Sequence, residues 1–136
     1  RTLEELRALH SSRHVFGPST YGLRGDLRGR VLNPELAAQD AIHPVVIRHP
    51  DSGRKALYVN PAFTVRIEGW SDEESRPLLQ YLYQHAVRPE FSCRFQWRPG
   101  SIAFWDNRCT WHYALNDYSG HRRLMHRITV EGVPLG

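Results

Sequence analysis

The stretch WDNRCTWHYALNDYSGHRRLMHRITVEG, residues 105–132, places one histidine, His112, ahead of two arginines, Arg123 and Arg127. Both arginines belong to RRLMHRITVEG, residues 122–132, whose later part has the branched, apolar composition of a β-strand. Because side chains alternate along a strand, the two arginines share one face and the opposite face is mainly apolar. The apolar face predicts packing against another layer. The arginine face, with guanidiniums ~13 Å apart at roughly 3.3 Å per residue, either binds two anions in a polar interior or lies exposed on an edge strand.

The composition predicts one globular domain, and its mild basicity, with a net charge of +4, suits small anionic substrates as well as it suits nucleic acid. A length of 136 residues suits a single domain, and 40% hydrophobic with 24% charged residues is ordinary for a folded chain. No apolar run is long enough to span a bilayer, so we expect no membrane contact. The 18 Lys and Arg residues are scattered among 14 Asp and Glu residues, and Arg122 and Arg123 alternate in direction, which argues against a nucleic-acid surface. Cys93 and Cys109 form no C-x-x-C pair, so we expect a reduced, cytoplasmic protein.

Two capping boxes predict the helices. Thr2–Glu5 (TLEE), followed by leucines at helical spacing, predicts a helix over residues 2–12. Ser71–Glu74 (SDEE) predicts a second helix that ends near His85. Between them, the glycine- and arginine-rich residues 16–34 have no steady period and predict a loop.

Much of the remaining chain predicts β-strands in antiparallel hairpins. Residues 43–60 contain two extended runs around the turn at residues 51–53, and residues 91–97, 101–107 and 122–132 predict further strands. The resulting five or six strands are too few to close a small barrel or jelly roll, which takes about eight. We therefore expect a β-rich α+β fold that forms part of a sandwich whose other strands lie elsewhere.

Several motifs resemble one enzyme family. The pattern W-D-N-R-x-T-x-H-Y-A (105–114), then D-Y (117–118) and R-R-x-M-H-R (122–127), resembles the TauD/TfdA family of Fe(II)- and 2-oxoglutarate-dependent dioxygenases, as does HPVVIRHPDSGRKALYVNPAFTVRI (43–67). The likeness is greatest to the members that oxidise taurine or alkylsulfates, and it covers nearly the whole chain. It implies part of a double-stranded β-helix (a jelly-roll or cupin-like fold) with flanking helices. Residues 1–136 would then form the C-terminal half of one catalytic domain.

The resemblance also implies roles for four residues. Enzymes of this family hold iron with two histidines and one carboxylate, and His112 falls on the distal histidine. Arg123 falls on the arginine that pairs with the distal carboxylate of 2-oxoglutarate, a bidentate task that suits a guanidinium. Arg127 falls on the arginine that binds the substrate sulfonate, and Phe63 on an aromatic residue that lines the substrate pocket.

The other two family ligands form an H-x-D/E motif, and the chain contains one H-x-D triplet, His49-Pro50-Asp51. It stands in HPDSG, where Asp and Ser favour a hairpin turn, so we interpret it as a turn and not as a ligand pair. We expect the two missing ligands upstream of Arg1, with His112 as the one iron ligand inside the chain.

Other candidate residues have structural interpretations. His126 lies on the apolar face of its predicted strand and is interpreted as a hydrogen-bonded core residue. Trp97 and Trp105 are predicted core residues, and Tyr113 is expected to pack beside the ligand. Asp106 is expected to organise the end of its strand and not to bind metal.

These inferences together imply an Fe(II)- and 2-oxoglutarate-dependent dioxygenase that uses O2 to oxygenate a small sulfonate, taurine. The products would be sulfite, an aldehyde, succinate and CO2. Relatives of this kind form dimers or tetramers, so we expect a homo-oligomer. One alternative is a dioxygenase of the same family that acts on an alkylsulfate or another sulfonate. The other, from a different class, is a non-catalytic β-module that binds anions with the same arginines.

Overall fold

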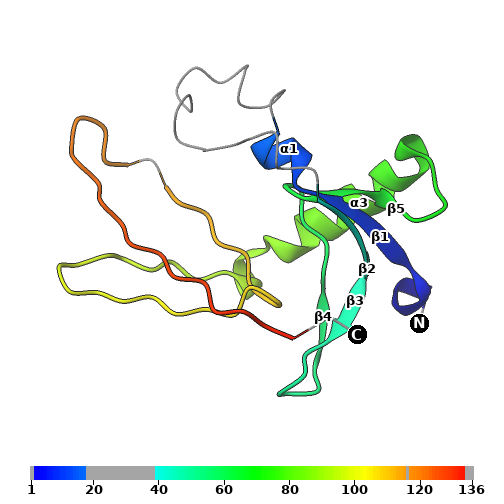
Figure 1. The fold of residues 1–136 in the computed structure, drawn as a ribbon, viewed down its shortest axis with the longest axis horizontal. Coiled ribbons are helices and arrows are strands. Elements are labelled where there is room, and N and C mark those ends of the chain that lie inside the picture. The colour runs from blue at the N-terminus through cyan, green and yellow to red at the C-terminus, as the bar shows by residue number, and fades with distance from the viewer. Residues whose placement is uncertain (1, 18–38, 116, 134–136) are drawn as a thin grey trace.

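The computed structural model describes residues 2–17, 39–115 and 117–133. Its helices and strands are, in chain order, η1 (Thr2–Glu5), β1 (Arg7–Ser11), α1 (Arg13–Phe16), β2 (Asp40–Pro44), β3 (Val46–Arg48), β4 (Lys55–Leu57), β5 (Thr64–Ile67), α3 (Asp72–Ala86) and η4 (Pro89–Phe91). In Figure 1 the strands and α3 form one body, and the segments drawn from yellow-green to red extend away from it as long loops. The described chain is therefore β-rich with few helices.

Strand β1 is the centre of a three-stranded antiparallel sheet of order β2-β1-β5. Its register pairs Ala8 with His43 of β2 and with Ile67 of β5. The prediction of a helix over residues 2–12 is wrong beyond Glu5, where a short 3-10 helix ends. A central strand has its backbone groups bonded on both sides, and this pairing outweighs the local helical pattern of the leucines.

Strands β3 and β4 form the predicted hairpin. They pair in antiparallel register, with Ile47 opposite Ala56. The Gly53 N–H donates to the His49 carbonyl at 2.8 Å, and Gly53 has a φ of 67°, which a residue without Cβ adopts readily. The hairpin prediction is confirmed, and the turn holds the residues between His49 and Gly53 in a fixed shape.

Helix α3 is the second predicted helix, and its capping box is formed as expected. The Ser71 hydroxyl accepts from the Glu74 N–H at 3.2 Å, and the Glu74 carboxylate accepts from the Ser71 N–H at 2.8 Å. The buried Ser75 hydroxyl accepts from the Ile67 N–H at 3.0 Å, which ties the helix to β5. The core between them consists of Ala8, Val45, Val59, Ile67, Leu79 and Leu82. No helix in the described ranges has both the length and the apolar character needed to cross a membrane.

Residues 92–115 and 117–133 belong to no strand. The strands predicted over residues 91–97, 101–107 and 122–132 are therefore not formed, because none of these segments pairs with a partner strand among the described residues. Many of their large apolar side chains are consequently exposed: Phe95, Trp97, Ile102, Phe104, Tyr113, Leu124, Ile128 and Val130. Exposed apolar groups of this size are typical of surfaces that contact another molecule or another part of a protein.

Two residues of these segments that were predicted to lie in a core are exposed. Trp97 is 47% exposed and His126 is exposed, so neither residue is in a core, while Trp105 is half-buried. Of the loop predicted over residues 16–34, residues 18–34 lie outside the described ranges.

A group of three rings, of which His10 is buried and the other two are half-buried, joins β1, β2 and the residue that follows β4. The ring of His10 lies 5.4 Å from that of His43 and 5.5 Å from that of Tyr58, centroid to centroid. His10 is 8% exposed, and its Nε2 atom has no hydrogen-bond partner among the described residues. Burial first, and the neighbouring His43 second, lower the pKa of His10 to about 4. His10 is therefore neutral in the folded protein at any pH near neutrality.

This lowered pKa predicts a loss of stability in mild acid. An unfolded histidine takes up a proton near pH 6.5, whereas folded His10 does so near pH 4, so the unfolded state binds more protons between these values. The contribution of His10 is complete above pH 6.5 and is lost as the pH falls toward 4, by roughly 3 kcal/mol in all. Urea unfolding of the complete protein between pH 7.5 and 4.5 measures this, and His10→Gln should remove that part of the pH dependence. The control His121→Gln, at an exposed turn, should keep it. A His10→Gln protein with an unaltered pH profile would show that another group is responsible.

Candidate functional site

His112 lies on the loop just after the turn at residues 107–109. Its side chain is exposed, and its ring centroid lies 5.0 Å from that of Trp105, with the planes inclined by 46°. The neighbouring residue Trp111 contacts Tyr83 of α3, with ring centroids 6.3 Å apart. His112 makes no hydrogen bond with any residue in the described ranges, so its ring nitrogens are available to an ion.

Arg123 and Arg127 both have exposed side chains on the last loop. The Arg123 guanidinium carbon lies 5.4 Å from the ring centroid of Tyr118, a cation–π contact that restricts where the guanidinium points. Neither arginine forms a salt bridge within the part of the chain that the structure describes. Because residues 122–132 are not a paired strand here, the strand alternation that gave the two arginines a common face is not formed in this structure. What remains is a pair of guanidiniums without acidic partners in residues 2–17, 39–115 and 117–133.

Phe63 lines a cavity of about 450 Å³ beside the first sheet. The Asn60 side chain sets the position of Phe63, because its Oδ1 accepts from the N–H groups of Ala62 at 3.0 Å and of Phe63 at 2.9 Å. The ring of Phe16, at the end of α1, lies 6.1 Å from that of Phe63. The rings of His10, His43 and Tyr58 line the same cavity. The cavity thus has an aromatic side formed by Phe16 and Phe63 and is otherwise lined largely by polar residues.

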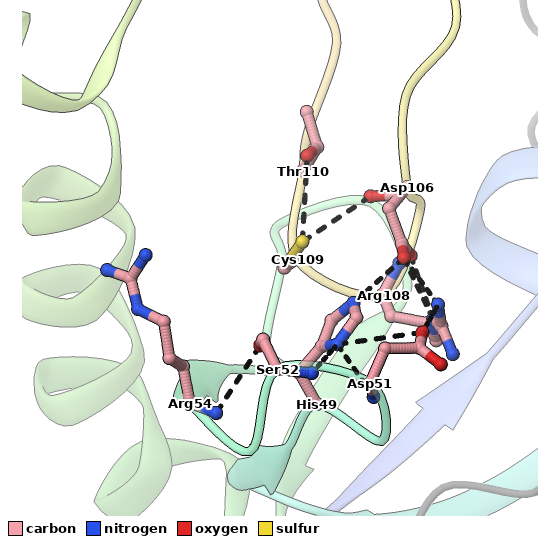
Figure 2. Close-up of polar contacts among 8 residues, drawn as sticks. All are labelled: His49, Asp51, Ser52, Arg54, Asp106, Arg108, Cys109 and Thr110. Atoms are coloured by element: carbon pink, nitrogen blue, oxygen red, sulfur yellow. Dashed lines mark hydrogen bonds and ion pairs between the residues drawn. The ribbon is translucent and has the colours of Figure 1, made fainter.

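The triplet His49-Pro50-Asp51 occupies the β3–β4 turn, which confirms the turn interpretation. Both ring nitrogens of His49 are already used. Its Nδ1 lies 3.3 Å from the backbone N–H groups of Asp51 and Ser52, and its Nε2 lies 2.9 Å from a carboxylate oxygen of Asp106 (Figure 2). An imidazole with both nitrogens in hydrogen bonds has no lone pair left for a metal.

Asp106 organises the turn that follows it, whereas the strand whose end it was predicted to organise is not formed. Its Oδ1 accepts from the Arg108 backbone N–H at 2.8 Å, and its Oδ2 accepts from the Arg108 Nη2 at 2.6 Å. Arg108 Nη2 also lies 3.0 Å from an Asp51 oxygen, so the guanidinium bridges two carboxylates (Figure 2). The hydrogen bonds from Arg108, and then that from His49, hold the pKa of Asp106 well below its usual range, and the same contact raises the pKa of Arg108.

One group of side chains in the described ranges has the spacing of metal ligands. Ligand atoms of His49, Asp106 and Cys109 all lie within 4.8 Å of one another. Arg108, however, donates to the same Asp106 oxygen as His49 does, at 2.6 Å, and its fixed positive charge repels a cation there. We therefore interpret this group as a neutralised polar network and not as a metal site.

Sequence reasoning missed two parts of this site. It gave no role to Arg108, although the spacing D-x-R in Asp106–Arg108 is compatible with a side chain that turns back on its own loop. It also placed His10 in a helix, so it did not predict that His10 lies beside His43 and Tyr58. That grouping depends on strand pairing between segments more than 30 residues apart, as between His10 and Ala41.

Comparison with known proteins identifies the family. The family model described as Taurine catabolism dioxygenase TauD, TfdA family, matches residues 1–129. An alkylsulfatase of Acinetobacter baylyi is 36% identical over 130 residues, which cover 95% of this chain and 41% of the relative. An alpha-ketoglutarate-dependent sulfate ester dioxygenase of Pseudomonas putida is 44% identical over 95 residues, which cover 69% of this chain and 31% of the relative. The chain thus spans less than half the length of these two relatives.

A solved structure supports the same assignment. The crystal structure of AAD-2 in complex with Mn(II) and N-oxalylglycine is 28% identical, with a TM-score of 0.53, and the match covers 71% of this chain and 35% of that one. This likeness confirms the predicted fold class, a β-rich part of a double-stranded β-helix. The protein belongs to the TauD/TfdA family of 2-oxoglutarate-dependent dioxygenases.

Proposed function

We propose that the complete protein is an Fe(II)- and 2-oxoglutarate-dependent dioxygenase that oxygenates a small sulfonate, with taurine as the first candidate. Residues 1–136 would be the C-terminal half of its double-stranded β-helix domain. The observation that carries this proposal is the family match over residues 1–129, which includes His112, Arg123 and Arg127 together. The exposed apolar side chains of residues 92–133 agree with it, because they need cover from strands outside this chain.

For the metal, we propose His112 as one of three iron ligands. Its exposed imidazole has no competing hydrogen bond with a described residue, and the Trp105 ring beside it limits its orientation. A neutral imidazole suits iron in the two-histidine, one-carboxylate arrangement of such enzymes. The remaining histidine and carboxylate would come from outside residues 1–136.

For the two anions, we propose that Arg123 binds the distal carboxylate of 2-oxoglutarate and that Arg127 binds the substrate sulfonate. A guanidinium presents paired N–H donors to either group, and these two are unpaired within the described ranges. The Tyr118 ring supports Arg123 from one side, which favours a fixed direction for its donors. Phe63 and its cavity would contact the carbon part of the substrate.

The reaction divides between the bound iron and the chain. Iron with 2-oxoglutarate and O2 supplies the oxidant for one C–H bond. Arg127 would hold the sulfonate so that the carbon bearing sulfur faces the metal. The energy of binding the sulfonate would thereby orient the C–H bond that reacts. If the substrate is taurine, one oxygen atom of O2 would enter that carbon, and the C–S bond would then break to give sulfite and an aldehyde. The other oxygen atom would enter succinate as 2-oxoglutarate loses CO2.

A sulfate ester is the second candidate substrate, because the two relatives described above are named as an alkylsulfatase and a sulfate ester dioxygenase. Arg127 would bind a sulfate group in the same way, and oxygenation of the carbon next to the ester oxygen would release sulfate. Incubation of the complete protein with taurine and with a short alkyl sulfate distinguishes the two, by sulfite or sulfate release coupled to succinate. Assembly as a dimer or tetramer and a cytoplasmic location stay predictions.

Replacement of His112 by Ala should abolish turnover and weaken iron binding strongly, since two of three ligands remain. Titration of the metal-free complete protein with Fe(II) under anaerobic conditions measures the affinity, and succinate release measures turnover. His121→Ala, at an exposed turn on the neighbouring loop, is the matched control and should retain both. Turnover near that of the parent in His112→Ala would remove His112 from the metal site.

Loss of the two arginines should appear in different kinetic constants. Arg123→Lys keeps the charge but loses the paired donors, so it should chiefly raise the KM for 2-oxoglutarate. Arg127→Ala should raise the KM for the sulfonate and lower kcat, because a loosely held substrate is badly aimed. A charged hydrogen bond is worth roughly 1.5–3 kcal/mol, so kcat/KM should fall at least about tenfold.

Arg94→Ala, at another exposed arginine of the long loops, serves as the control and should leave both KM values unchanged. If Arg127→Ala leaves the sulfonate kinetics unchanged while alkyl carboxylates are oxidised well, the sulfonate assignment is wrong and the dioxygenase class stands.

A further inference from the structure

The contacts in Figure 2 join two turns whose contacting residues lie 57 positions apart in the chain. One turn is the β3–β4 hairpin, which supplies His49 and Asp51. The other precedes His112 and supplies Asp106 and Arg108. We name these four side chains the turn clasp. None of them has a part in the substrate or iron chemistry proposed above, so the clasp needs an explanation of its own.

The hairpin turn fixes the direction in which His49 donates. The backbone N–H groups of Asp51 and Ser52 both point at His49 Nδ1, each at 3.3 Å. The Nδ1 lone pair is therefore an acceptor, and in the neutral ring the proton sits on Nε2. That Nε2–H donates to Asp106 at 2.9 Å. The turn thus orients the ring and selects the tautomer, and the ring directs one hydrogen bond at the other turn.

The other turn presents a carboxylate that is shaped to receive this bond. Arg108 donates to both Asp106 oxygens and also to Asp51 across the gap, so its guanidinium lies between the two turns. The side chains of His49, Arg108 and Asp106 are 15%, 27% and 31% exposed, so solvent screens these bonds only in part. Charge-assisted bonds in such a setting are stronger than neutral ones.

The clasp matters for His112 because the loop has little else to hold it. Residues 101–115 belong to no strand in the described chain, so no ladder of backbone hydrogen bonds fixes them. The clasp holds the loop at Asp106 and Arg108, before His112. Trp111, the residue immediately before His112, has its ring in contact with that of Tyr83 of α3. Trp105, the neighbour of Asp106, carries the constraint to the His112 ring itself, at 5.0 Å between centroids.

We propose that His49, Asp106 and Arg108 are positioning residues that fix the His112 loop, and with it the direction of the His112 ring, against the β3–β4 hairpin. His49 therefore acts on the metal site from outside, by a hydrogen bond between two turns, and never as a ligand. This inference rests on the proposed role of His112 as an iron ligand. Partners beyond the ligands commonly change metal affinity by about 10–100-fold when they are removed.

Three substitutions of His49 in the complete protein distinguish the roles of its two ring nitrogens, the acceptor Nδ1 in the hairpin turn and the Nε2 donor to Asp106. His49→Ala removes both. His49→Gln places an amide nitrogen near the position of Nε2 and keeps the donor to Asp106. His49→Asn places an amide oxygen near the position of Nδ1, so it satisfies the hairpin turn but is too short to reach Asp106. Arg88→Ala is the control, because it breaks an exposed ion pair with Glu90, 2.8 Å long, outside the clasp.

The first measurement is backbone amide exchange over residues 106–112 in the metal-free protein. We expect exchange at least about tenfold faster in His49→Ala and His49→Asn, since a charge-assisted bond is lost. His49→Gln should stay within about threefold of the parent, and Arg88→Ala should match it. The comparison of His49→Gln with His49→Asn stands even if His49→Ala fails to fold. Unaltered exchange over residues 106–112 in His49→Asn would overturn the clasp.

The second measurement is Fe(II) affinity in the same variants. We expect a Kd raised about tenfold or more in His49→Asn and restored in His49→Gln. Faster exchange with an unchanged Kd would overturn the positioning role, although the clasp would exist and the proposed function would stand. If His112→Ala binds Fe(II) like the parent, the proposed role of His112 as an iron ligand is wrong. Amide exchange in the metal-free protein does not depend on iron, so it still tests the clasp in that case.

Discussion

The Asp106 carboxylate joins the β3–β4 hairpin to the loop that carries His112, together with the Asp51–Arg108 ion pair and the Trp111–Tyr83 ring contact. It accepts one hydrogen bond from His49 of the hairpin and several from Arg108 of its own turn. Because Arg108 and His49 hold the pKa of Asp106 well below its usual range, the carboxylate stays charged at any pH near neutrality. The charge of Asp106 therefore stays constant over the pH range in which His10 begins to destabilise the fold.

The H-x-D triplet shows how a short motif acquires its meaning from the surrounding fold. In sequence, His49-Pro50-Asp51 has the spacing of an iron-binding pair. In the structure, Asp51 bonds to Arg108, and both nitrogens of His49 are occupied. The same residues that imitate a metal site thus support the loop of the proposed ligand, His112. Hydrogen-bond occupancy of the imidazole distinguishes the two roles, and no spacing rule could do so.

The sequence predicts the local features of this fold well and the long-range ones poorly. The capping box at Ser71 and the hairpin turn at Gly53 need only neighbouring residues, and both were predicted. Residues 7–11 were mistaken for helix, because their strand exists through partners elsewhere in the chain. The predicted strands after residue 91 fail for the converse reason, since the described chain offers them no partner. The motif residues His112, Arg123 and Arg127 could be named by resemblance alone, whereas Arg108 and His49 needed coordinates.

The central claim is that residues 1–136 supply one iron ligand, His112, and that His49 is not another. A crystal structure of the complete protein with Fe(II) and 2-oxoglutarate, collected at the iron absorption edge, tests it most directly. The anomalous peak should lie within bonding distance of the His112 ring, with His49 still hydrogen-bonded to Asp106 and the Arg123 guanidinium on the distal carboxylate of 2-oxoglutarate. An iron peak bonded to His49 or Asp51, with His112 turned toward solvent, would contradict the account.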